Sequence, residues 1–312
     1  MTKPRCSEAD FTHLVETLGI GGAATRLNIN IRNANRRRRR IEEKTGKSIN
    51  PPGSKAPPRE AHPSRIQIDI QDGIILIGSD AHYWPGIIST AHRAFLHFCR
   101  EHHPKFVIMN GDMVDGASVS RYPPLNWGHL PTVLDEIKTV GERLDEIRAA
   151  SLNAEFFWPL GNHDARFETR LATVAHEFAG LKGFRLKDHF PHWLPCWDIW
   201  VNNDVVVKHR FKGGVHATLV NAKDSGKSMV TGHLHSLRVT PWSDYNGTRW
   251  GVDTGTLADP DGPQFDYSEN NPRNHRSGFV MLTFKDNELL WPELISVKRE
   301  GVVDFRGELI EV

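Results

Sequence analysis

KFVIMNGDMVD, residues 105–115, is the stretch that decides the fold of this chain. Its first half is an apolar run of the kind that forms buried strands, and its second half is a loop that carries two aspartates. The same arrangement, an apolar run followed by Asp, Asn or His, occurs at four other places in the sequence. These are Asp80-Ala81-His82, Gly161-Asn162-His163-Asp164, His209 and Gly232-His233-Leu234-His235.

Segments with a helical pattern alternate with these strands, and alternation of this kind predicts a parallel, buried sheet. In an open sheet of this class, ligands bind outside the carboxyl ends of the strands, so the five polar fragments are expected to meet. The predicted helices cover residues 86–101, 131–150, 165–179 and 215–222.

The two ends of this region have a different pattern. Residues 65–70 alternate like an edge strand, and Asp72-Gly73 predicts a hairpin turn into residues 74–77. Asn246-Gly247 predicts a second turn, and residues 278–310 contain further alternating strands. The expected fold is therefore an α/β two-sheet sandwich flanked by helices, in which antiparallel hairpins extend the parallel strands.

The side chains of the five fragments offer carboxylate and amide oxygens and imidazole nitrogens, without a thiolate. This mixture suits Mn²⁺, Zn²⁺ or Fe better than Ca²⁺. Seven ligands are too many for one tetrahedral ion, and they divide between two ions about 3.5–4 Å apart that activate water. Any single fragment has a structural alternative, because Asp after a strand often caps the next segment. For the lone histidine we prefer His209 to His216, since His209 ends the apolar run VVVK.

The series DxH, GDxxD, GNHD, a lone His and GHxH resembles the calcineurin-like metallophosphoesterase superfamily over about residues 74–260. The resemblance implies two divalent metal ions, Mn²⁺ in the first place and Zn²⁺ or Fe as alternatives. It implies that His163 is the catalytic histidine, which protonates the leaving oxygen, and that Asp164 orients it. The implied ligands are Asp80, His82, Asp112 and His235 for the first metal, and Asp112, Asn162, His209 and His233 for the second.

The motifs depart from one branch of that superfamily. Phosphoprotein phosphatases have Arg-Gly after GDxxD and have GNHE, whereas this chain has Gly116-Ala117 and GNHD. A protein phosphatase is therefore disfavoured, and the resemblance is closer to the bacterial and phage-type branch with phosphodiesterases and nucleases. Arg166 and Arg210 lie beside motif residues, and the sequence leaves open whether they bind a phosphate or face solvent.

The first part of the chain has another character. Residues 1–65 hold 14 Lys and Arg against 6 Asp and Glu, whereas the remainder holds 25 against 32. Residues 1–46 resemble a helix-turn-helix, with Asn30 as N-cap of a second helix that Gly46 ends. Residues 47–64 form a Pro-rich linker to a metallophosphoesterase domain at 65–312. The candidate nucleic-acid contacts are Arg32, Asn33, Asn35, Arg36, Arg37, Arg39 and Arg40; the alternative is a charged helix that binds any polyanion.

Composition excludes some other classes. No run approaches the roughly 18 apolar residues that a membrane span needs. The widely spaced Cys6, Cys99 and Cys196 indicate reduced thiols, and the N-terminus lacks the apolar core of a signal peptide. We expect a cytoplasmic protein without a membrane partner, which a phage could encode and which would then act in the host cytoplasm.

Together these patterns predict a dimetal phosphoester hydrolase, a phosphodiesterase or nuclease that acts on nucleic acid. One alternative is a phosphatase or phosphodiesterase for small molecules or nucleotides, in which the basic head serves only localisation. Another is a DNA-binding regulator without enzymatic activity, in which the metal site is structural. The pair His163-Asp164 favours an enzyme, because a structural metal site does not require it.

Overall fold

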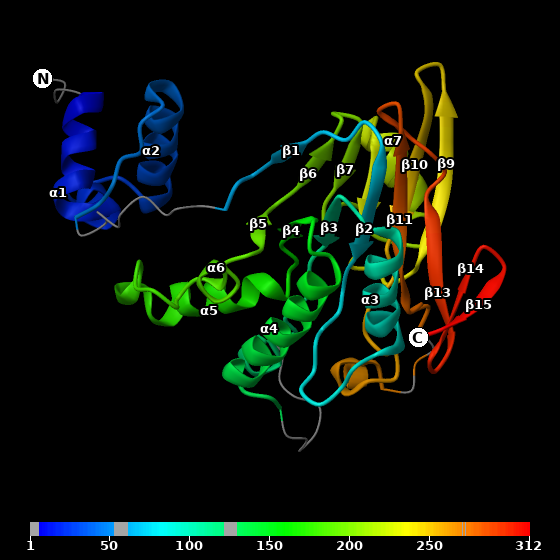
Figure 1. Cartoon of the computed structure of the whole chain (residues 1–312). Coiled ribbons are helices and arrows are strands. Elements are labelled where there is room, and N and C mark those ends of the chain that lie inside the picture. Colours follow the sequence, from blue (N-terminus) through cyan, green and yellow to red (C-terminus); the bar gives the residue numbers. More distant parts are fainter. Residues whose placement is uncertain (1–5, 53–61, 122–129, 270, 272) are drawn as a thin grey trace, which may run out of the picture. The chain divides into compact units, whose positions relative to one another are not determined.

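A computed structural model of the chain forms two compact units, Met1–Glu60 and Ala61–Val312 (Figure 1). Each unit has hydrophobic clusters of its own. The residues that the structure describes are 6–52, 62–121, 130–269, 271 and 273–312.

The N-terminal unit contains two helices, α1 (Glu8–Leu27) and α2 (Ile31–Thr45). Ser7 and Asn30 cap their amino ends, and Gly46 ends α2 in a left-handed conformation with φ 65°. Helix α1 continues through Gly21-Gly22 and bends at Gly19, where φ is 72° and ψ is 171°. The core of this unit consists mainly of Phe11, Val15, Ala23, Ala24, Ala34, Ile41 and Ile49.

The larger unit contains two mixed sheets. The six-stranded sheet has the order β1-β6-β7-β8-β10-β9, in which β7 and β8 are parallel. Its strands are β1 (Ile66–Ile68), β6 (Ile199–Val201), β7 (Val205–Val207), β8 (Ser228–Thr231), β10 (Gly247–Asp253) and β9 (Arg238–Asp244).

The nine-stranded sheet has the order β15-β14-β13-β11-β2-β3-β4-β5, and β12 pairs with β11. Its strands β2 to β5 are parallel, whereas β11 to β15 are antiparallel, as the sequence predicted. The strands are β2 (Gly73–Gly78), β3 (Phe106–Met109), β4 (Glu155–Pro159), β5 (Leu194–Cys196), β11 (Gly278–Lys285), β12 (Glu288–Leu289), β13 (Glu293–Arg299), β14 (Val302–Phe305) and β15 (Glu308–Glu311).

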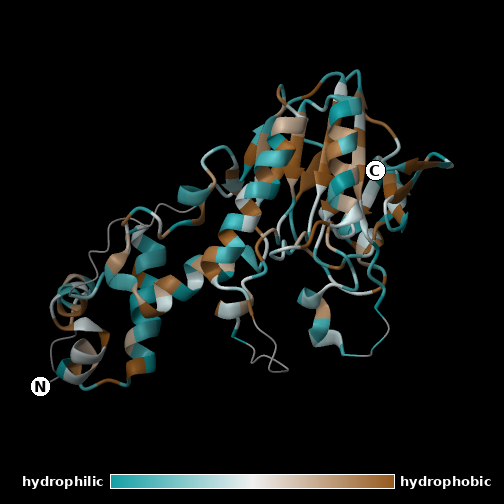
Figure 2. Ribbon diagram, turned by 60° about the horizontal axis from the view of Figure 1, so that its bottom comes forward, coloured by the Kyte–Doolittle hydropathy of each residue, from teal (hydrophilic) through white to brown (hydrophobic). Residues whose placement is uncertain are grey.

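The two sheets pack face to face, and helices cover their outer faces. One cluster, with Ile75, Ile108 and Val230 among its members, fills the space between the sheets. A second cluster joins the other face of the nine-stranded sheet to α3 and α4, while α7 packs on the six-stranded sheet. In Figure 2 the strands are mostly brown, and the helices carry both teal and brown residues. This is the two-sheet sandwich that the sequence predicted.

The remaining helices connect the strands. The α-helices are α3 (Thr90–His102), α4 (Val133–Ala150), α5 (Asp164–Val174), α6 (Leu186–His189) and α7 (Ala217–Ser225), and the 3₁₀ turns are η1 (Ala117–Val119), η2 (His176–Phe178) and η3 (Pro263–Ser268). Among the described residues, none of the helices is both long and apolar enough to cross a bilayer.

The predicted hairpin at Asp72-Gly73 is wrong. Strand β1 pairs with β6 in one sheet, whereas β2 pairs with β3 and β11 in the other. The chain crosses between the sheets after Ile68, and Asn202 holds the crossing through hydrogen bonds to the backbone of Ile70. The Asn246-Gly247 turn is confirmed, because β9 and β10 form an antiparallel pair across it.

Candidate metal centre

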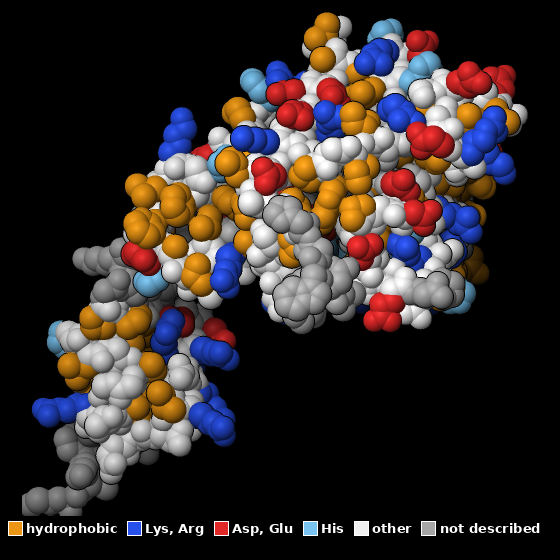
Figure 3. All heavy atoms as spheres, turned by 90° about the horizontal axis from the view of Figure 1, so that it is seen from below, with side chains coloured by type: hydrophobic (Ala, Val, Ile, Leu, Met, Phe, Trp, Pro, Cys, Tyr) orange, Lys and Arg blue, Asp and Glu red, His pale blue; other side chains and the backbone are white. Residues whose placement is uncertain are grey.

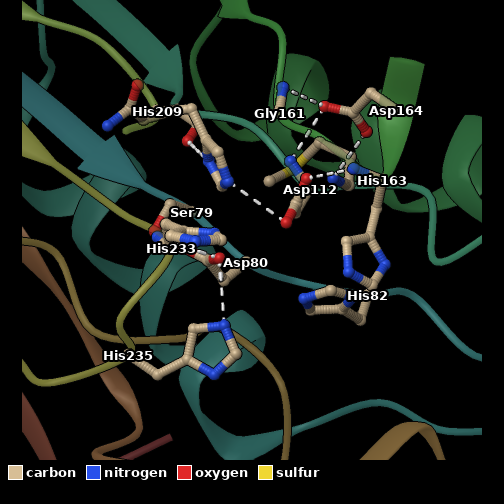
Figure 4. Close-up of polar contacts among 12 residues, drawn as sticks. Ser79, Asp80, His82, Asp112, Gly161, His163, Asp164, His209, His233 and His235 are labelled. Carbon is tan, nitrogen blue, oxygen red and sulfur yellow. Dashed lines mark hydrogen bonds and ion pairs between the residues drawn. The ribbon is translucent and has the colours of Figure 1, made fainter. Parts of the chain in front are cut away.

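Five strands end at the same place in the larger unit. Strands β2, β3 and β4 are parallel neighbours in one sheet, and β7 and β8 are parallel neighbours in the facing sheet. Each is followed by one of the five polar fragments, so the loops after these strands bring the polar side chains together (Figure 4).

The donor atoms of these fragments form three overlapping groups. Within each group, one ligand atom per residue lies within 4.8 Å of the others. The groups are Asp80, His82 and His235; Asp112, His209 and His233; and His82, Asp112 and His163. The last group shares His82 with the first and Asp112 with the second, and thus joins them.

Five of the candidate ligands have a left-handed backbone, which non-glycine residues adopt rarely. Such conformations cost on the order of 1–3 kcal/mol each and cluster at functional sites. They allow consecutive loop residues to turn their side chains toward one point. The φ values are 51° at Asp80, 39° at His82, 55° at Asp112, 71° at His233 and 55° at His235.

Asp80 is fully buried at the centre of the first group. Its Oδ1 lies 3.0 Å from Nε2 of His235, and both of its oxygens accept from the backbone N–H of His233, at 3.1 and 2.9 Å. The hydroxyl of Ser79 donates to Oδ2. The carboxylate is therefore held in one orientation from three sides.

The second group is arranged around Asp112. Nε2 of His209 lies 3.1 Å from Oδ2 of Asp112, and both side chains are 2% exposed. Nδ1 of His209 contacts the carbonyl oxygen of Asn110 at 2.8 Å, which leaves Nε2 as the nitrogen that faces the cluster. A backbone carbonyl on the second ring nitrogen is the usual partner of a metal-ligating histidine.

Glycines let the loops approach the carboxylates closely. A Cβ at Gly161 would lie 2.0 Å from Oδ1 of Asp112, and a Cβ at Gly232 would lie 2.4 Å from Oδ2 of Asp80. Any other residue at these positions would displace a candidate ligand. This explains in physical terms why GNHD and GHLH begin with glycine.

The pKa shifts in the cluster show that its buried carboxylates favour a positive charge beside them. Burial opposes ionisation of Asp112, but the adjacent His209 holds the pKa of that carboxyl well below its usual range. Burial likewise opposes charge on His209, but Asp112 and Asp80 raise its pKa to about 10. The positive charge of a protonated His209 thus balances the carboxylates that a bound cation could balance.

The donor set fits divalent metal ions. Oδ1 of Asn162 is buried and has no hydrogen-bond partner among the described residues. Buried polar atoms normally have partners, so this oxygen fits a metal ligand. His216, the alternative to His209, is exposed at the start of α7.

Asp115 orients two histidines of the site. Its Oδ1 lies 2.9 Å from Nδ1 of His82 and 3.2 Å from Nδ1 of His163. Its carbonyl oxygen is also 2.8 Å from Nδ1 of His163. Both rings thus have Nε2 left for other contacts, and they stand edge to face with centroids 4.6 Å apart.

The sequence assigned the orientation of His163 to Asp164, and the structure corrects this. Asp164 is fully buried, and its two oxygens accept hydrogen bonds from main-chain and indole N–H groups rather than from His163. Its donors are the backbone N–H groups of Asp112, Met113, Val114 and Gly161 and the indole N–H of Trp158, at 2.8–3.0 Å. Asp164 therefore fixes the loop after β3 against the loop after β4 (Figure 4).

The candidate nucleic-acid residues lie on α2 in the N-terminal unit. Six of them are exposed, namely Arg32, Asn33, Asn35, Arg36, Arg39 and Arg40. Arg37 is the exception: it donates to the carbonyls of Cys6 and Ser7, and its guanidinium lies 4.6 Å from the centroid of the Phe11 ring. Because these contacts stabilise the fold of the unit itself, we do not expect Arg37 to contact nucleic acid. Figure 3 shows Lys and Arg side chains of this unit in blue.

The structure adds residues that the sequence did not single out. Asp115 stood in a recognised motif but received no role. Phe265 and His275 line the first group, since the ring of His275 lies 4.4 Å from that of His235 and the ring of Phe265 lies 5.6 Å from that of His82. These two residues come from an irregular segment without a motif, so the sequence offered no signal for them.

The sequence model of the calcineurin-like phosphoesterase family matches residues 74–258. The chain belongs to the calcineurin-like phosphoesterase family. The matched range contains all seven candidate metal ligands and His163. Calcineurin-like phosphoesterases act on phosphoester substrates and bind divalent metals, in agreement with the donor set of this centre.

Several solved structures are similar to this chain at low sequence identity. Vps29 from Entamoeba histolytica, complexed with Zn²⁺, is 15% identical, with a TM-score of 0.41 over 76% of this chain and 98% of its own. An archaeal phosphodiesterase is 17% identical, with a TM-score of 0.39 over 72% and 99%. Vps29 from Chaetomium thermophilum is 9% identical, with a TM-score of 0.37 over 77% and 97%. A comparison with curated protein sequences gives no match.

Proposed function

We propose that this calcineurin-like phosphoesterase is a dimetal-dependent hydrolase of phosphodiesters, a phosphodiesterase or nuclease that acts on nucleic acid. The observation that supports this most is the position of Asp112. It is 1% exposed and belongs both to the group with His209 and His233 and to the group with His82. A carboxylate in such a position can be shared by two ions.

In this proposal, each of the two groups without His163 holds one metal ion, together with the further ligands named below. Bound in these places, two divalent ions, with Mn²⁺ preferred and Zn²⁺ or Fe as alternatives, supply a nucleophile from water near neutral pH and neutralise phosphoryl charge. One ion would be held by Asp80, His82, Asp112 and His235, and the other by Asp112, Asn162, His209 and His233.

His163 has the role of general acid. Its Nδ1 is engaged by Asp115, which leaves Nε2 to carry a proton to the leaving oxygen of the ester. His163 is the N-cap residue of α5, and its backbone N–H donates to Oδ1 of Asp112 at 2.8 Å. The general acid and the proposed bridging carboxylate are therefore held at a fixed distance by one hydrogen bond.

The basic N-terminal unit supports nucleic acid as the substrate or partner. Arg32, Arg36 and Arg39 are spaced four and three residues apart and are all exposed, so they follow one face of α2. The opposite face of α2 carries the buried Ala34 and Ile41. A helix with a buried apolar face and a basic exposed face suits contact with a phosphate backbone, and its binding depends on salt. We place this activity in the cytoplasm, either of the cell that encodes the chain or of a phage host.

The test is a panel of substrates assayed with Mn²⁺, Zn²⁺ and Mg²⁺, for the full chain and for His163→Ala. The panel contains phosphomonoesters, small phosphodiesters, and single- and double-stranded DNA. We expect diester and DNA hydrolysis with Mn²⁺, and loss of about 100-fold or more in His163→Ala, because general-acid catalysis contributes roughly 10²–10⁴-fold. Metal content, measured on the same samples by mass spectrometry, should not change.

Each of the following outcomes would contradict the proposal and would favour one alternative or another mechanism. Hydrolysis that survives in His163→Ala with metal bound would contradict the assigned mechanism. Turnover of small diesters or monoesters without action on DNA would identify an enzyme for small molecules or nucleotides, in which the head serves localisation. Binding of metal and DNA without any hydrolysis would identify a regulator with a structural metal site.

A further inference from the structure

Arg166 reaches into the proposed centre from the first turn of α5. Its Nη1 donates to the carbonyl oxygen of Asp115 at 2.9 Å, and its Nη2 lies 3.0 Å from Nε2 of His163. This Nε2 is the ring nitrogen that Asp115 leaves free. The guanidinium and the proposed general acid therefore converge on one point.

The surrounding loop holds Arg166 in this position. Gly116 has φ 64°, and a Cβ there would lie 3.1 Å from Cδ of Arg166, so the arginine stem passes directly over this glycine. The N–H groups of Gly116 and Ala117 donate to the carboxylate of Glu136 in α4, at 2.6 and 3.0 Å. A side chain packed in this way is half-buried and differs from a solvated surface arginine.

The charge of Arg166 has no acidic partner in these contacts. Among the described residues, its two hydrogen-bond partners are a backbone carbonyl and Nε2 of His163, and neither carries a negative charge. Nε2 accepts from the guanidinium only while it is unprotonated, so in the acid form of His163 this N–H of Arg166 has no acceptor there. A guanidinium is always charged and offers five N–H donors in a planar fork that matches phosphate oxygens. Glu136 acts on Arg166 through charge alone, and the hydrogen-bond partners of Arg166 are neutral. A half-buried cation with neutral hydrogen-bond partners, beside a general acid, is suited to an anionic ligand.

We infer that Arg166 binds the nonbridging oxygens of the substrate phosphoryl group, on the side where His163 presents Nε2. This inference rests on the proposed hydrolase and names the residue that grips its substrate. The sequence alone did not show which of Arg166 and Arg210 binds a phosphate. Arg210 is exposed after β7, and the packing just described distinguishes Arg166 from it.

Inorganic phosphate is the probe for this site. Its binding to the full-length, Mn²⁺-loaded protein is measured by calorimetry for Arg166→Met, Arg166→Lys and the control Arg170→Met. Arg170 is exposed one helical turn further along α5. We expect phosphate affinity to fall by about 10- to 100-fold in Arg166→Met, the loss that one or two charge-assisted hydrogen bonds imply, and to fall less in Arg166→Lys. Arg170→Met should bind phosphate as the unaltered chain does.

Two further readouts decide how a loss is interpreted. Mn²⁺ affinity and the thermal midpoint should be unchanged in Arg166→Lys, and KM for a small phosphodiester should rise in that variant. Unchanged phosphate affinity in Arg166→Met, or equal losses in Arg166→Met and Arg170→Met, would overturn the inference. If phosphate binds through Arg166 but no ester in the panel is hydrolysed, the anion site stands and the proposed hydrolase activity does not.

Discussion

At the scale of single residues, Asp115 connects the proposed metal chemistry to the proposed acid chemistry. One carboxylate oxygen contacts a candidate ligand, His82, and the candidate acid, His163. Burial disfavours the ionised carboxylate, but His163 and His82 hold the pKa of Asp115 well below its usual range. The residue is therefore a fixed anion that orients both rings.

We predict that Asp115→Asn lowers metal affinity and hydrolysis together. The amide oxygen of asparagine carries no negative charge and accepts weaker hydrogen bonds than the carboxylate, so both His82 and His163 lose part of their orientation. Loss of such an outer partner typically costs roughly 10- to 100-fold in metal affinity or activity. Mn²⁺ titration and initial rates on a small diester measure the two effects.

The matched control for this change is Asp304→Asn, an exposed aspartate in β14. It removes the same charge from the chain without touching the centre. If Asp115→Asn kept both the metal affinity and the rate of the control, the role of Asp115 in orienting the rings would be disproved.

The candidate ligands could be predicted from the sequence because each stands directly after an apolar strand. The partner of His163 could not be predicted. His163 and Asp164 are adjacent at the start of a helix, and neighbouring helical residues point in directions about 100° apart. Asp164 therefore faces the interior and accepts from the backbone of the loop after β3, while His163 faces Asp115. The resemblance implied a contact between these two side chains, and neighbouring residues at a helix start do not face each other.

At the scale of secondary-structure elements, a buried histidine connects α3 to α4. Nδ1 of His92 lies 2.9 Å from the hydroxyl of Tyr83, and Nε2 lies 2.8 Å from Glu146 in α4. Burial lowers the pKa of His92 from its ordinary value of 6.5 to about 4, although Glu146 acts in the opposite direction. The neutral imidazole is thus the form that the folded protein favours.

We predict that this histidine makes stability fall in mild acid. Between about pH 6.5 and 4, the unfolded chain protonates His92 while the folded chain does not. Its contribution is fully present above pH 6.5 and is lost as the pH falls to 4, a loss of about 3 kcal/mol. Urea unfolding at intervals of half a pH unit measures this.

His92→Gln provides the comparison, because glutamine is polar but does not titrate. The difference in unfolding free energy between the unaltered chain and His92→Gln should shrink or reverse as the pH falls through this window. A difference that stays constant from pH 7 to 4 would show that His92 titrates alike in both states.

Local patterns predicted most elements but not every strand partner. Helices α4 and α7 and strand β3 occur within a few residues of their expected positions. The chain does bend at Gln71-Asp72, but Gly73 already belongs to β2, and β1 and β2 enter different sheets. A turn signal reports only that the chain changes direction. The sheet that each strand joins is decided by the packing of Ile68, Ile70 and Ile75 between the sheets, which involves residues more than a hundred positions away.

At the scale of the whole molecule, the chain consists of two units with separate cores. The shift in charge and the prolines of residues 47–64 favour a basic head, a linker and a phosphoesterase domain, and the bounds of that division stay a prediction. The layers of the larger unit could also be predicted from the alternation of strands and helices. The segment from 259 to 277 could not, because it has neither periodicity nor a motif, yet it supplies Phe265 and His275 to the centre.

We predict that the two units contribute separately to action on DNA. Deletion of residues 1–60 should leave hydrolysis of a small diester within about twofold and should weaken binding to DNA. In the full chain, replacement of Arg32, Arg36 and Arg39 by alanine should lower the slope of log affinity against log salt by about 3, since each phosphate contact contributes about 0.9. Fluorescence anisotropy with labelled DNA over a series of salt concentrations measures this slope.

The control replaces Arg100, Lys138 and Lys182, three exposed cations of the larger unit, by alanine. It removes the same net charge and should leave the slope unchanged. Equal changes in both triple variants would mean that net charge, and not the face of α2, governs binding. Equal loss of small-diester and DNA hydrolysis on deletion would contradict a separable head.

The left-handed backbone at five candidate ligands has an evolutionary consequence. Glycine or asparagine adopts this conformation more easily than histidine, so a copy of this chain that no longer needed its metals could gain stability by exchanging these residues, about 1 kcal/mol at each. Selection for catalysis opposes that drift. Among descendants of this chain, histidine and aspartate at these positions should therefore mark working enzymes, and glycine or asparagine should mark copies retained for another purpose. The positions are Asp80, His82, Asp112, His233 and His235.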